Sequence, residues 1–367
     1  MTRGVPAKVD MVDLFAGPGG LDVAARWLGV SALGIEWDTN ACATRVMAGL
    51  ATEKGDVRDH TPKEYSGARI LAGGPPCQTY TVAGTGDGRR ALKLVVRAAE
   101  SMASGEDPET VLTTVDERTR LVLEPLRWAL EAYRAGEPYQ AVVLEQVPAV
   151  LPVWQTVRAV LIGIGYRCEC GILRTEQFGV PQTRRRAILI ARLGAEATLP
   201  APTHRPFRRD VPRDEGDATL RPWRTMHEAL AHDRPEPFTV VSNYGTGGDP
   251  KNRGRRTSDQ PAFTVTGKVS RNRVKTAGGG YDRFTPAEAG MLQTFPRDYP
   301  WSGRDIAQQI GNAIPPRLAV HVLASALGRT VNEESLDEAI TRSWSDARPD
   351  SPVVVSTPNV GAATTLI

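Results

Sequence analysis

A cysteine placed after two prolines is the residue best suited to nucleophilic chemistry. Cys77 follows Pro75-Pro76 within the glycine-rich stretch 73–84, directly after the short apolar run 69–72. Prolines restrict the backbone before the thiol, and glycines permit the turn that would expose it. Most free cysteines are simply small buried apolar residues, but apolar packing does not explain rigid prolines and a polar Gln78 around this one. The pattern favours a nucleophile at the exit of a strand.

A carboxylate follows the most apolar run of this region. Residues 141–144 are continuously apolar, which is typical of a strand buried on both faces, and Glu145 comes next. Ligands bind at the carboxyl ends of central parallel strands, so Glu145 is a second candidate for chemistry. The plain alternative is a surface or helix-capping glutamate.

Three polar side chains alternate before a further strand at 187–191. Gln182, Arg184 and Arg186 would share one face of an extended segment. They could therefore act together at the same sheet edge.

The elements that position these residues begin with an α/β unit. A strand at 9–15 runs into the glycine turn 16–20, which is followed by an amphipathic helix at 21–28. The next strand, 32–35, ends at Glu36, where a carboxylate can accept ribose hydroxyls. The turn lacks the Gly-x-Gly-x-x-Gly pattern of a pyrophosphate cradle. S-adenosylmethionine therefore fits better than NAD.

Composition places the chain among ordinary globular proteins. It has 367 residues, 41% of them hydrophobic and 24% charged, and no apolar run reaches the roughly 18 residues of a membrane span. Without a signal peptide, we expect a cytoplasmic protein. The four cysteines form no zinc pattern, and we expect no metal. A net charge of +3 is too small to imply a partner by itself.

Three further segments have a predicted character. Residues 85–115 read as an insertion, either a lid or a plain surface excursion, and residues 116–134 as one amphipathic helix with Pro125 near its first turns. Short strand signals occur at 237–241 and 262–266. Residues 331–367 are polar and rich in Pro, Ser and Thr, so we expect them to be poorly ordered.

Together these motifs resemble the cytosine-5 DNA methyltransferase family of bacterial and phage type. The resemblance lies in Asp-Leu-Phe-Ala-Gly-Pro-Gly-Gly at 13–20, Glu36, Pro-Pro-Cys-Gln at 75–78, Glu145, Gln-x-Arg-x-Arg at 182–186, and Gln-Ile-Gly-Asn-Ala-Ile-Pro-Pro at 309–316. It implies an α/β fold, with a Rossmann-like S-adenosylmethionine-dependent methyltransferase domain and a smaller, irregular β-rich target recognition domain. The implied division is a catalytic domain at 1–195, target recognition at 196–282, a return to the catalytic domain at 283–330, and the tail at 331–367.

The resemblance also implies residue roles. The implied catalytic group is Cys77, Glu145, Arg184, Arg186 and Gln182. The implied contacts to S-adenosyl-L-methionine are Phe15, Gly17, Gly19, Glu36, Trp37, Asp56, Val57, Pro76, Leu121 and Asn312. The implied reaction adds the Cys77 thiolate to a flipped cytosine and methylates its carbon 5.

Basic residues concentrate in the segment with no fixed motif, the expected target recognition domain. The candidates for DNA contact are Arg253, Arg255, Arg256, Lys268, Arg271 and Arg273. Such runs are usually only a solvated face, yet phosphate contacts require this local excess. We expect double-stranded DNA as the partner of a monomer, with restriction–modification or phage and host DNA protection as the setting and a cognate restriction endonuclease as a companion.

Two departures from the family pattern and three alternatives remain. The family usually has Asn where this chain has Gln146, and the segment between Cys77 and Glu145 is longer than usual. The alternatives are a tRNA cytosine-5 methyltransferase, a nicotinamide oxidoreductase and a DNA-binding module without activity. The basic segment favours DNA over tRNA, and the intact Cys77 and Glu145 disfavour the inactive module.

Overall fold

A large mixed sheet forms the centre of the computed structural model, which describes residues 9–76, 86–243 and 253–346. Within these residues, seven strands take the order β3-β2-β1-β4-β5-β7-β6. The strands are β1 (Met11–Leu14), β2 (Ala32–Glu36), β3 (Ala51–Lys54), β4 (Ile70–Gly73), β5 (Ala141–Gln146), β6 (Tyr166–Arg174) and β7 (Arg185–Leu193). Strands β1 to β5 run parallel, and β7 lies antiparallel between β5 and β6. The predicted α/β class is confirmed.

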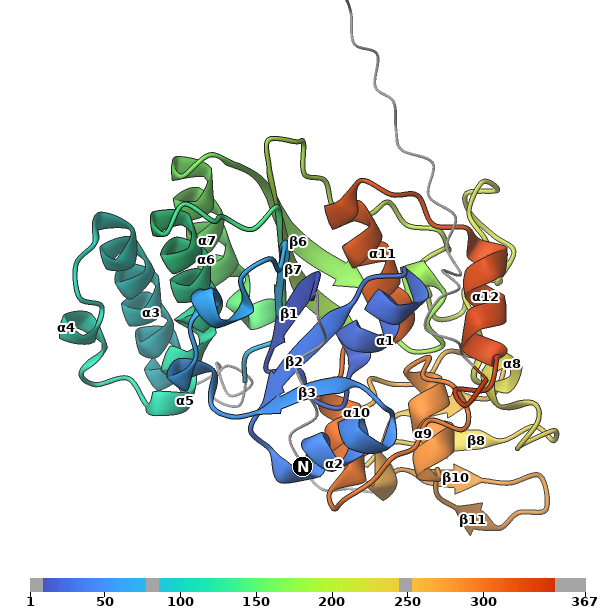
Figure 1. Ribbon diagram of the computed structural model, residues 1–367. Coiled ribbons are helices and arrows are strands. Elements are labelled where there is room, and N and C mark those ends of the chain that lie inside the picture. The colour runs from blue at the N-terminus through green and yellow to red at the C-terminus, as the bar shows by residue number, and fades with distance from the viewer. Residues whose placement is uncertain (1–8, 77–85, 244–252, 347–367) are drawn as a thin grey trace, which may run out of the picture.

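Helices cover both faces of this sheet (Figure 1). Those of the large unit are α1 (Gly20–Trp27), α2 (Thr39–Met47), α3 (Gly86–Ser104), α4 (Glu109–Leu112), α5 (Glu117–Arg120), α6 (Glu124–Arg134), α7 (Leu151–Gly163), α11 (Pro316–Leu327) and α12 (Glu333–Thr341). One face packs against α3, α6 and α7 through a core that includes Val12, Leu144 and Trp154. The opposite face packs against α1 and α11.

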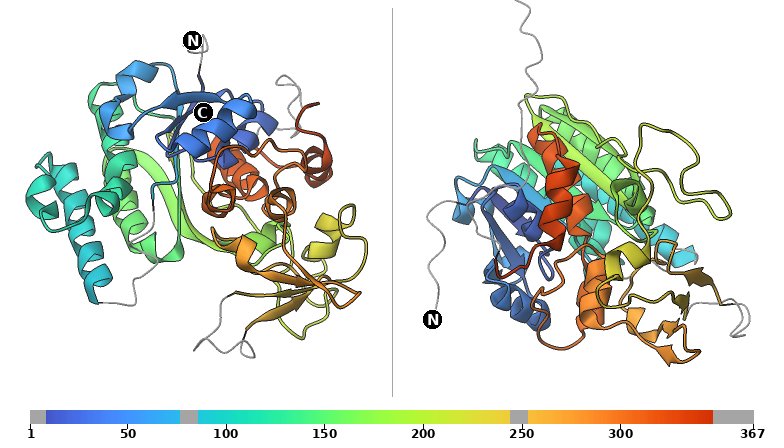
Figure 2. Two further views of the ribbon diagram at one scale, coloured as in Figure 1. Left: turned by 90° about the horizontal axis from the view of Figure 1, so that it is seen from below. Right: turned by 90° about the vertical axis from the view of Figure 1, so that its right-hand side faces the viewer.

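A smaller unit follows the large sheet in the sequence. Its four strands, in the order β11-β10-β8-β9, are β8 (Thr239–Val241), β9 (Arg255–Thr257), β10 (Arg273–Lys275) and β11 (Tyr281–Asp282) among the described residues. Helices α8 (Met226–Leu230), α9 (Pro286–Leu292) and α10 (Ile306–Asn312) share its core with Val240 and Val274. In Figure 2 this unit extends to one side of the large sheet.

Two expected segments differ in the structure. Residues 86–104 form α3 rather than a loop excursion, because Val95 and Ala98 enter the core beside α7. The sequence 262–266 is not a strand: its only assigned β contact is an isolated bridge between Ala262 and Gln182.

The expected helix at 116–134 is divided. It comprises α5, a 3₁₀ turn at Leu121–Leu123, and α6, which has Pro125 in its first turn as expected. Proline needs no amide hydrogen at that position, so the break falls where the sequence tolerates it.

The C-terminal segment is better ordered than its composition predicts. Residues 333–341 form α12, with Leu336 buried, and Trp344 packs against Tyr299. The expectation of a poorly ordered tail is therefore wrong for this part, while residues 347–367 lie outside the described residues. The apolar residues of α12 recur at helical spacing but stand among acidic residues, so composition alone did not predict this helix.

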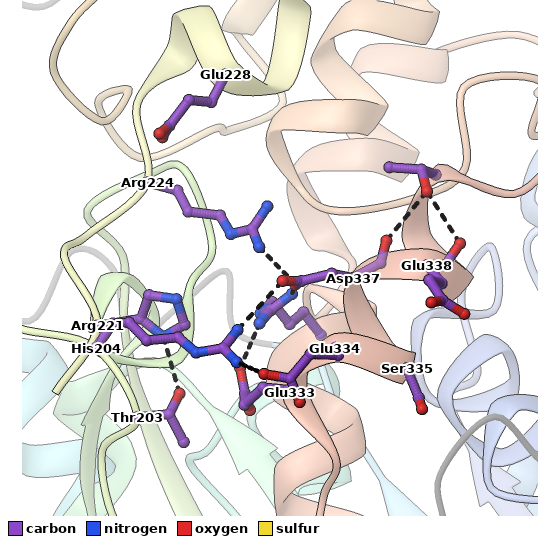
Figure 3. Close-up of polar contacts among 12 residues, drawn as sticks. Thr203, His204, Arg221, Arg224, Glu228, Glu333, Glu334, Ser335, Asp337 and Glu338 are labelled. Carbon is purple, nitrogen blue, oxygen red and sulfur yellow. Dashed lines mark hydrogen bonds and ion pairs between the residues drawn. The ribbon is translucent and has the colours of Figure 1, made fainter. Parts of the chain in front are cut away.

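Charged residues attach α12 to the rest of the protein (Figure 3). The buried Arg317 guanidinium pairs with Glu333 and Asp337, and its Nε donates to the Phe178 carbonyl at 2.6 Å. Arg221 also reaches Asp337, at 3.3 Å. We call this set, together with Arg224, Glu334, His204 and His321, the α12 clasp.

The α12 clasp makes the free energy of unfolding depend on pH. Burial, followed by the charge of Arg317, lowers the pKa of His204 to about 3, and the pKa of Glu333 falls to about 2 although burial opposes that shift, because His321 and Arg317 favour its ionised form. Both groups bind fewer protons when folded, so their stabilisation is complete above about pH 6.5 and is lost as pH falls. Each pH unit in this range is worth about 1.4 kcal/mol. From His204 alone we therefore predict that the free energy of unfolding falls by about 3 kcal/mol between pH 6.5 and 4.

Urea unfolding followed by circular dichroism at several pH values measures this loss. His204→Asn should flatten the pH dependence over that range. His232→Asn changes a histidine that is 76% exposed and should not alter it. An unchanged slope in His204→Asn would show that the acid sensitivity lies elsewhere.

Candidate active site

Three adjacent strands end at the same edge of the large sheet. Leu14 of β1 lies beside Gly73 of β4, and Gly73 lies beside Leu144 of β5. The residues that follow these strands therefore meet, as the carboxyl ends of parallel strands do. This edge collects the glycine turn at 16–20, the segment Gly74–Pro76, and Glu145.

The glycine turn is closed by the carboxylate at the end of β2. Glu36 accepts hydrogen bonds from the Gly17 amide and the Asp38 amide, both at 2.7 Å. Burial raises the pKa of Glu36, and these two amides oppose that rise. Each carboxylate oxygen can accept a further hydrogen bond, so Glu36 keeps capacity for a ligand hydroxyl.

At one position this turn requires glycine, because a neighbouring side chain lies close to its backbone. Gly19 has φ +106°, and a Cβ there would lie 2.3 Å from the Leu50 side chain. Gly17 also has a positive φ, but a Cβ there would meet no heavy atom within 4 Å, so the side of the turn at Gly17 is open. Phe15 has φ +59° and is half-buried beside it.

Three more of the expected cofactor residues follow strands β2 and β3. Trp37 is 68% exposed directly after Glu36. Asp56 follows β3 and pairs with Arg58, which lowers the pKa of the Asp56 carboxyl. Val57 is buried, and its carbonyl accepts from the Trp128 indole of α6 at 3.3 Å.

The remaining three expected cofactor residues belong to three different segments. Leu121 lies half-buried in the 3₁₀ turn before α6, and Pro76 is half-buried after β4. Asn312 is exposed at the end of α10, where its side-chain oxygen accepts from Gln308 at 2.6 Å.

These residues fit an adenosyl cofactor. The observation is the open side of the Gly17 turn next to Glu36, an ionisable acceptor, with the exposed Trp37 ring adjoining it in sequence. Such a set offers hydrogen-bond acceptors for a ribose and an aromatic surface for a base, without a pyrophosphate cradle.

Glu145 pairs with Arg186 at the centre of the edge. Both side chains are nearly buried, and the ion pair joins Glu145 Oε1 to Arg186 Nε. A Cβ on Gly74 would lie 3.6 Å from the other carboxylate oxygen, so Glu145 faces the segment that leads to Cys77. This pairing joins two residues of the expected catalytic group, Glu145 and Arg186.

Gln146 contacts the same segment from the neighbouring position. Its buried side-chain amide donates to the Pro75 carbonyl. The amide of Val147 in turn donates to Gln146 Oε1. In the sequence, Gln146 was notable only as a departure from the family pattern. Its contact with Pro75 could not be predicted without the structure.

Gln182 and Arg184 do not accompany Arg186 to Glu145. Gln182 is fully buried, and the Arg184 guanidinium is 1% exposed and donates to backbone carbonyls of the 265 and 311–313 segments. The catalytic role expected for Gln182 and Arg184 stays a prediction, and in the structure both side chains bond to other parts of the protein. Distant segments close over both side chains, which local alternation cannot predict.

The basic residues divide between two environments. Exposed cations in the smaller unit are Arg255, Lys268, Arg271 and Arg273, and Arg253 is half-buried. On one face of the small sheet, the register aligns Arg255, Val241 and Arg273 in adjacent strands. Arg273 also lies over the Tyr281 ring at 3.7 Å.

Arg256 points to the opposite face. Its NH1 group donates to Thr183 and to the Pro261 and Ala262 carbonyls at 2.7–2.9 Å, and its guanidinium lies over the Phe263 ring at 4.5 Å. Burial lowers its pKa to about 10. These contacts hold the segment together, and the expectation that Arg256 contacts DNA stays a prediction.

Cys77 lies outside the described residues. The other cysteines are free, Cys42 and Cys168 buried and Cys170 half-buried. Burial raises the pKa of Cys42 to about 11 and of Cys168 to about 12, so neither supplies a thiolate near neutral pH.

Neither a metal-binding cluster nor a membrane-spanning helix occurs in the described part of the chain. Among residues 9–76, 86–243 and 253–346, no group of three or more His, Cys, Asp or Glu could hold a metal ion. Within the same ranges, no helix combines the length and apolar character needed to span a bilayer.

A largely parallel sheet with a glycine turn and a Glu–Arg pair at its carboxyl edge is the arrangement expected of a Rossmann-like methyltransferase. The chain belongs to the C-5 cytosine-specific DNA methylase family, whose model matches residues 9–102 and 139–328. The gap between these two ranges, 103–138, contains α4, α5 and α6.

Known proteins agree with this assignment. The chain is 27% identical over 363 residues to the Type II methyltransferase M1.HphI of Haemophilus parahaemolyticus, covering 88% of this chain and 87% of that protein. The S. pombe Dnmt2 methyltransferase has a similar fold, with a TM-score of 0.59 at 17% identity, covering 87% of this chain and 98% of that one. A putative DNA modification methyltransferase encoded within a prophage in E. coli has a TM-score of 0.52 at 17% identity, covering 87% and 98% of the two chains.

Proposed function

We propose that the protein transfers a methyl group from S-adenosyl-L-methionine to carbon 5 of a cytosine flipped out of duplex DNA. The observation that supports this most is the Glu145–Arg186 pair, which faces Gly74 in the segment leading to Cys77. Family membership supports the reaction class.

The proposed chemistry begins at Cys77. Addition of its thiolate to carbon 6 forms a carbon–sulfur bond and makes carbon 5 an enamine-like nucleophile. S-adenosylmethionine, when bound, supplies an electrophilic methyl group to that carbon. Loss of the carbon 5 proton then expels the sulfur and restores the ring double bond.

Glu145 is the proposed partner of ring nitrogen 3. A proton held there between the carboxyl group and the ring favours addition, because it offsets the negative charge that the thiolate brings. Arg186 occupies one oxygen of Glu145 in the structure, so the base would share this carboxyl group with Arg186. In this proposal, one proton-carrying group and one cation would lie where charge develops.

The proposed cofactor contacts are supported by the open glycine turn and by the family pattern. Glu36 would accept the ribose hydroxyls, with Phe15 and Trp37 against the adenine. Asp56 would accept from the adenine amine, and Asn312 would close the site. Gly17 and Gly19 shape the turn, and Val57, Pro76 and Leu121 complete the surrounding contacts.

Methyl transfer to duplex DNA tests the assignment directly. Tritium from labelled S-adenosylmethionine should enter duplex DNA and not tRNA, and bisulfite sequencing should place the methyl group on cytosine within one recurring sequence. Incorporation into tRNA alone would favour the tRNA methyltransferase alternative.

The smaller unit is the proposed target recognition domain. Arg253, Arg255, Lys268, Arg271 and Arg273 are its candidates for contact with DNA phosphates. Arg256 is set apart from these because its NH1 group already donates to three oxygens of the protein.

Salt dependence distinguishes the two classes of arginine. Arg273→Gln should lower the slope of log affinity against log salt by about one unit, because one phosphate contact is lost. Arg256→Gln should leave that slope unchanged and instead lower the unfolding free energy by about 1–3 kcal/mol, since it removes buried hydrogen bonds and a ring contact. Fluorescence anisotropy over a salt series measures the slope, and equal slopes for wild type and Arg273→Gln would remove Arg273 from the DNA surface.

The biological setting follows from the relatives. M1.HphI is named a Type II methyltransferase, and we propose that this protein likewise acts in a restriction–modification system in the cytoplasm, as a monomer beside a separate endonuclease. Analytical ultracentrifugation tests the monomer.

A further inference from the structure

A buried polar network joins the smaller unit to the large one, and it contains side chains that the reaction does not use. Gln182 accepts from the Val265 amide at 2.9 Å and donates to the Leu292 carbonyl at 3.0 Å and to Gln293. Gln293 donates to the carbonyls of Ile310 and Ala313. We call Gln182, Arg184 and Gln293 the polar hub.

Arg184 is the member that spans two segments directly. Its NH1 donates to the Val265 carbonyl at 2.8 Å, and its NH2 donates to the Gly311 and Ala313 carbonyls at 2.9 and 3.2 Å. Val265 belongs to the basic, motif-free region, whereas Gly311 and Ala313 flank Asn312. Because a guanidinium is rigid and planar, these carbonyls keep a fixed relation to one another.

The two segments also touch without an intermediary. A Cβ on Gly311 would lie 2.2 Å from the Gly267 nitrogen and 2.3 Å from the Thr266 carbonyl carbon. Contact this close means that neither backbone can shift toward the other.

A third contact reaches the Asn312 side chain. Gln308 donates to Asn312 Oδ1 at 2.6 Å, and a Cβ on Gly267 would lie 2.0 Å from Gln308 Oε1. The position of Gly267 thus decides whether Gln308 can hold Asn312.

We infer that the polar hub and the Gly267–Gln308 contact couple DNA binding to cofactor binding. DNA held by Lys268, Arg271 and Arg273 fixes the segment that contains Val265 and Gly267, and that segment positions Asn312. Gln182 and Arg184 are positioning residues in this reading. The inference rests on the proposed function, which supplies both ligands.

Coupling of this kind is reciprocal and measurable. The dissociation constant of S-adenosylhomocysteine, measured by calorimetry without DNA and with a saturating duplex that the wild type methylates, should differ by about fivefold or more. We call the factor between these two dissociation constants the coupling ratio. Arg184→Lys keeps the charge but cannot span both segments, so the coupling ratio should fall to about twofold or less.

A second variant avoids changing a buried charge. Gly267→Ala should push the exposed Gln308 side chain away from Asn312 and also reduce the ratio, with little loss of melting temperature because that side chain can move. Arg317→Lys is the matched control: it alters another fully buried guanidinium, in the α12 clasp, and should preserve the ratio.

The outcomes separate the inference from the proposed function. A wild type that binds neither ligand, or methylates no DNA, contradicts the proposed function. A wild type that binds both ligands without coupling contradicts the inference alone. So does a ratio preserved in both Arg184→Lys and Gly267→Ala, and if Arg184→Lys does not fold, Gly267→Ala decides.

Discussion

Cys77→Ser is expected to lower the rate of methyl transfer to duplex DNA by at least about 10³-fold. The serine hydroxyl has a far higher pKa than a thiol, so almost none of it is ionised at neutral pH, whereas a few per cent of an ordinary thiol is. Loss of a nucleophile leaves only binding and orientation to accelerate the reaction. Tritium transfer under single-turnover conditions measures the effect.

The other cysteines provide the controls. Cys170→Ser is the closest match, since Cys170 is half-buried and lies on β6, which β7 separates from β5. Its rate should stay within about twofold of wild type, as surface or peripheral substitutions usually do. A Cys77→Ser protein with more than a tenth of the wild-type rate would mean that another group attacks the base.

Glu145→Gln is expected to slow methyl transfer by about 10² to 10⁴-fold, the range in which positioned proton-transfer groups contribute. Glutamine keeps the size of the side chain but cannot give a proton to the ring. Binding of S-adenosylhomocysteine should remain within about threefold of wild type, because Glu145 lies on β5 while the cofactor contacts begin at β1 and β2. Single-turnover rates and calorimetry measure the two quantities.

Glu169→Gln is the matched control for that change. Glu169 is a partly exposed carboxylate on β6 that lies 4.0 Å from Arg158. It should leave both the rate and the cofactor affinity unchanged. A Glu145→Gln enzyme that loses cofactor affinity as strongly as rate would assign Glu145 to binding rather than to proton transfer.

The catalytic edge was predictable because its signals are local. Apolar runs that end in a glycine, a proline pair or a carboxylate predicted β1, β2, β4 and β5 within two residues of their observed bounds at most positions. In a parallel sheet the ends of such strands must meet. Glu36 and Glu145 could therefore be placed at one edge without knowledge of the helices.

Burial could not be predicted in the same way. Arg184 and Arg186 occupy equivalent positions in one alternating pattern, yet Arg184 is enclosed by the 265 and 311 segments while Arg186 reaches Glu145. Similarly, Arg255 and Arg256 are neighbours on opposite faces of β9. Which face is covered depends on residues far away in the sequence.

Composition did not predict two of the helices, α3 and α12. A polar start concealed Val95 and Ala98 of α3, and acidic residues concealed Leu336 of α12. The acidic residues of α12 are paired: Glu333 and Asp337 meet the buried Arg317. The polar composition that predicted disorder therefore includes side chains that are part of the tertiary structure.

Duplex DNA containing 5-fluorocytosine at the methylated position gives the most direct test of the central claim. Fluorine replaces the proton that must leave carbon 5, so the sulfur cannot be expelled after methyl transfer. We predict an adduct that requires S-adenosylmethionine, survives denaturing electrophoresis and maps by peptide mass to Cys77. A stable adduct at Cys42, Cys168 or Cys170, or complete turnover of the fluorinated DNA without any adduct, would contradict this account.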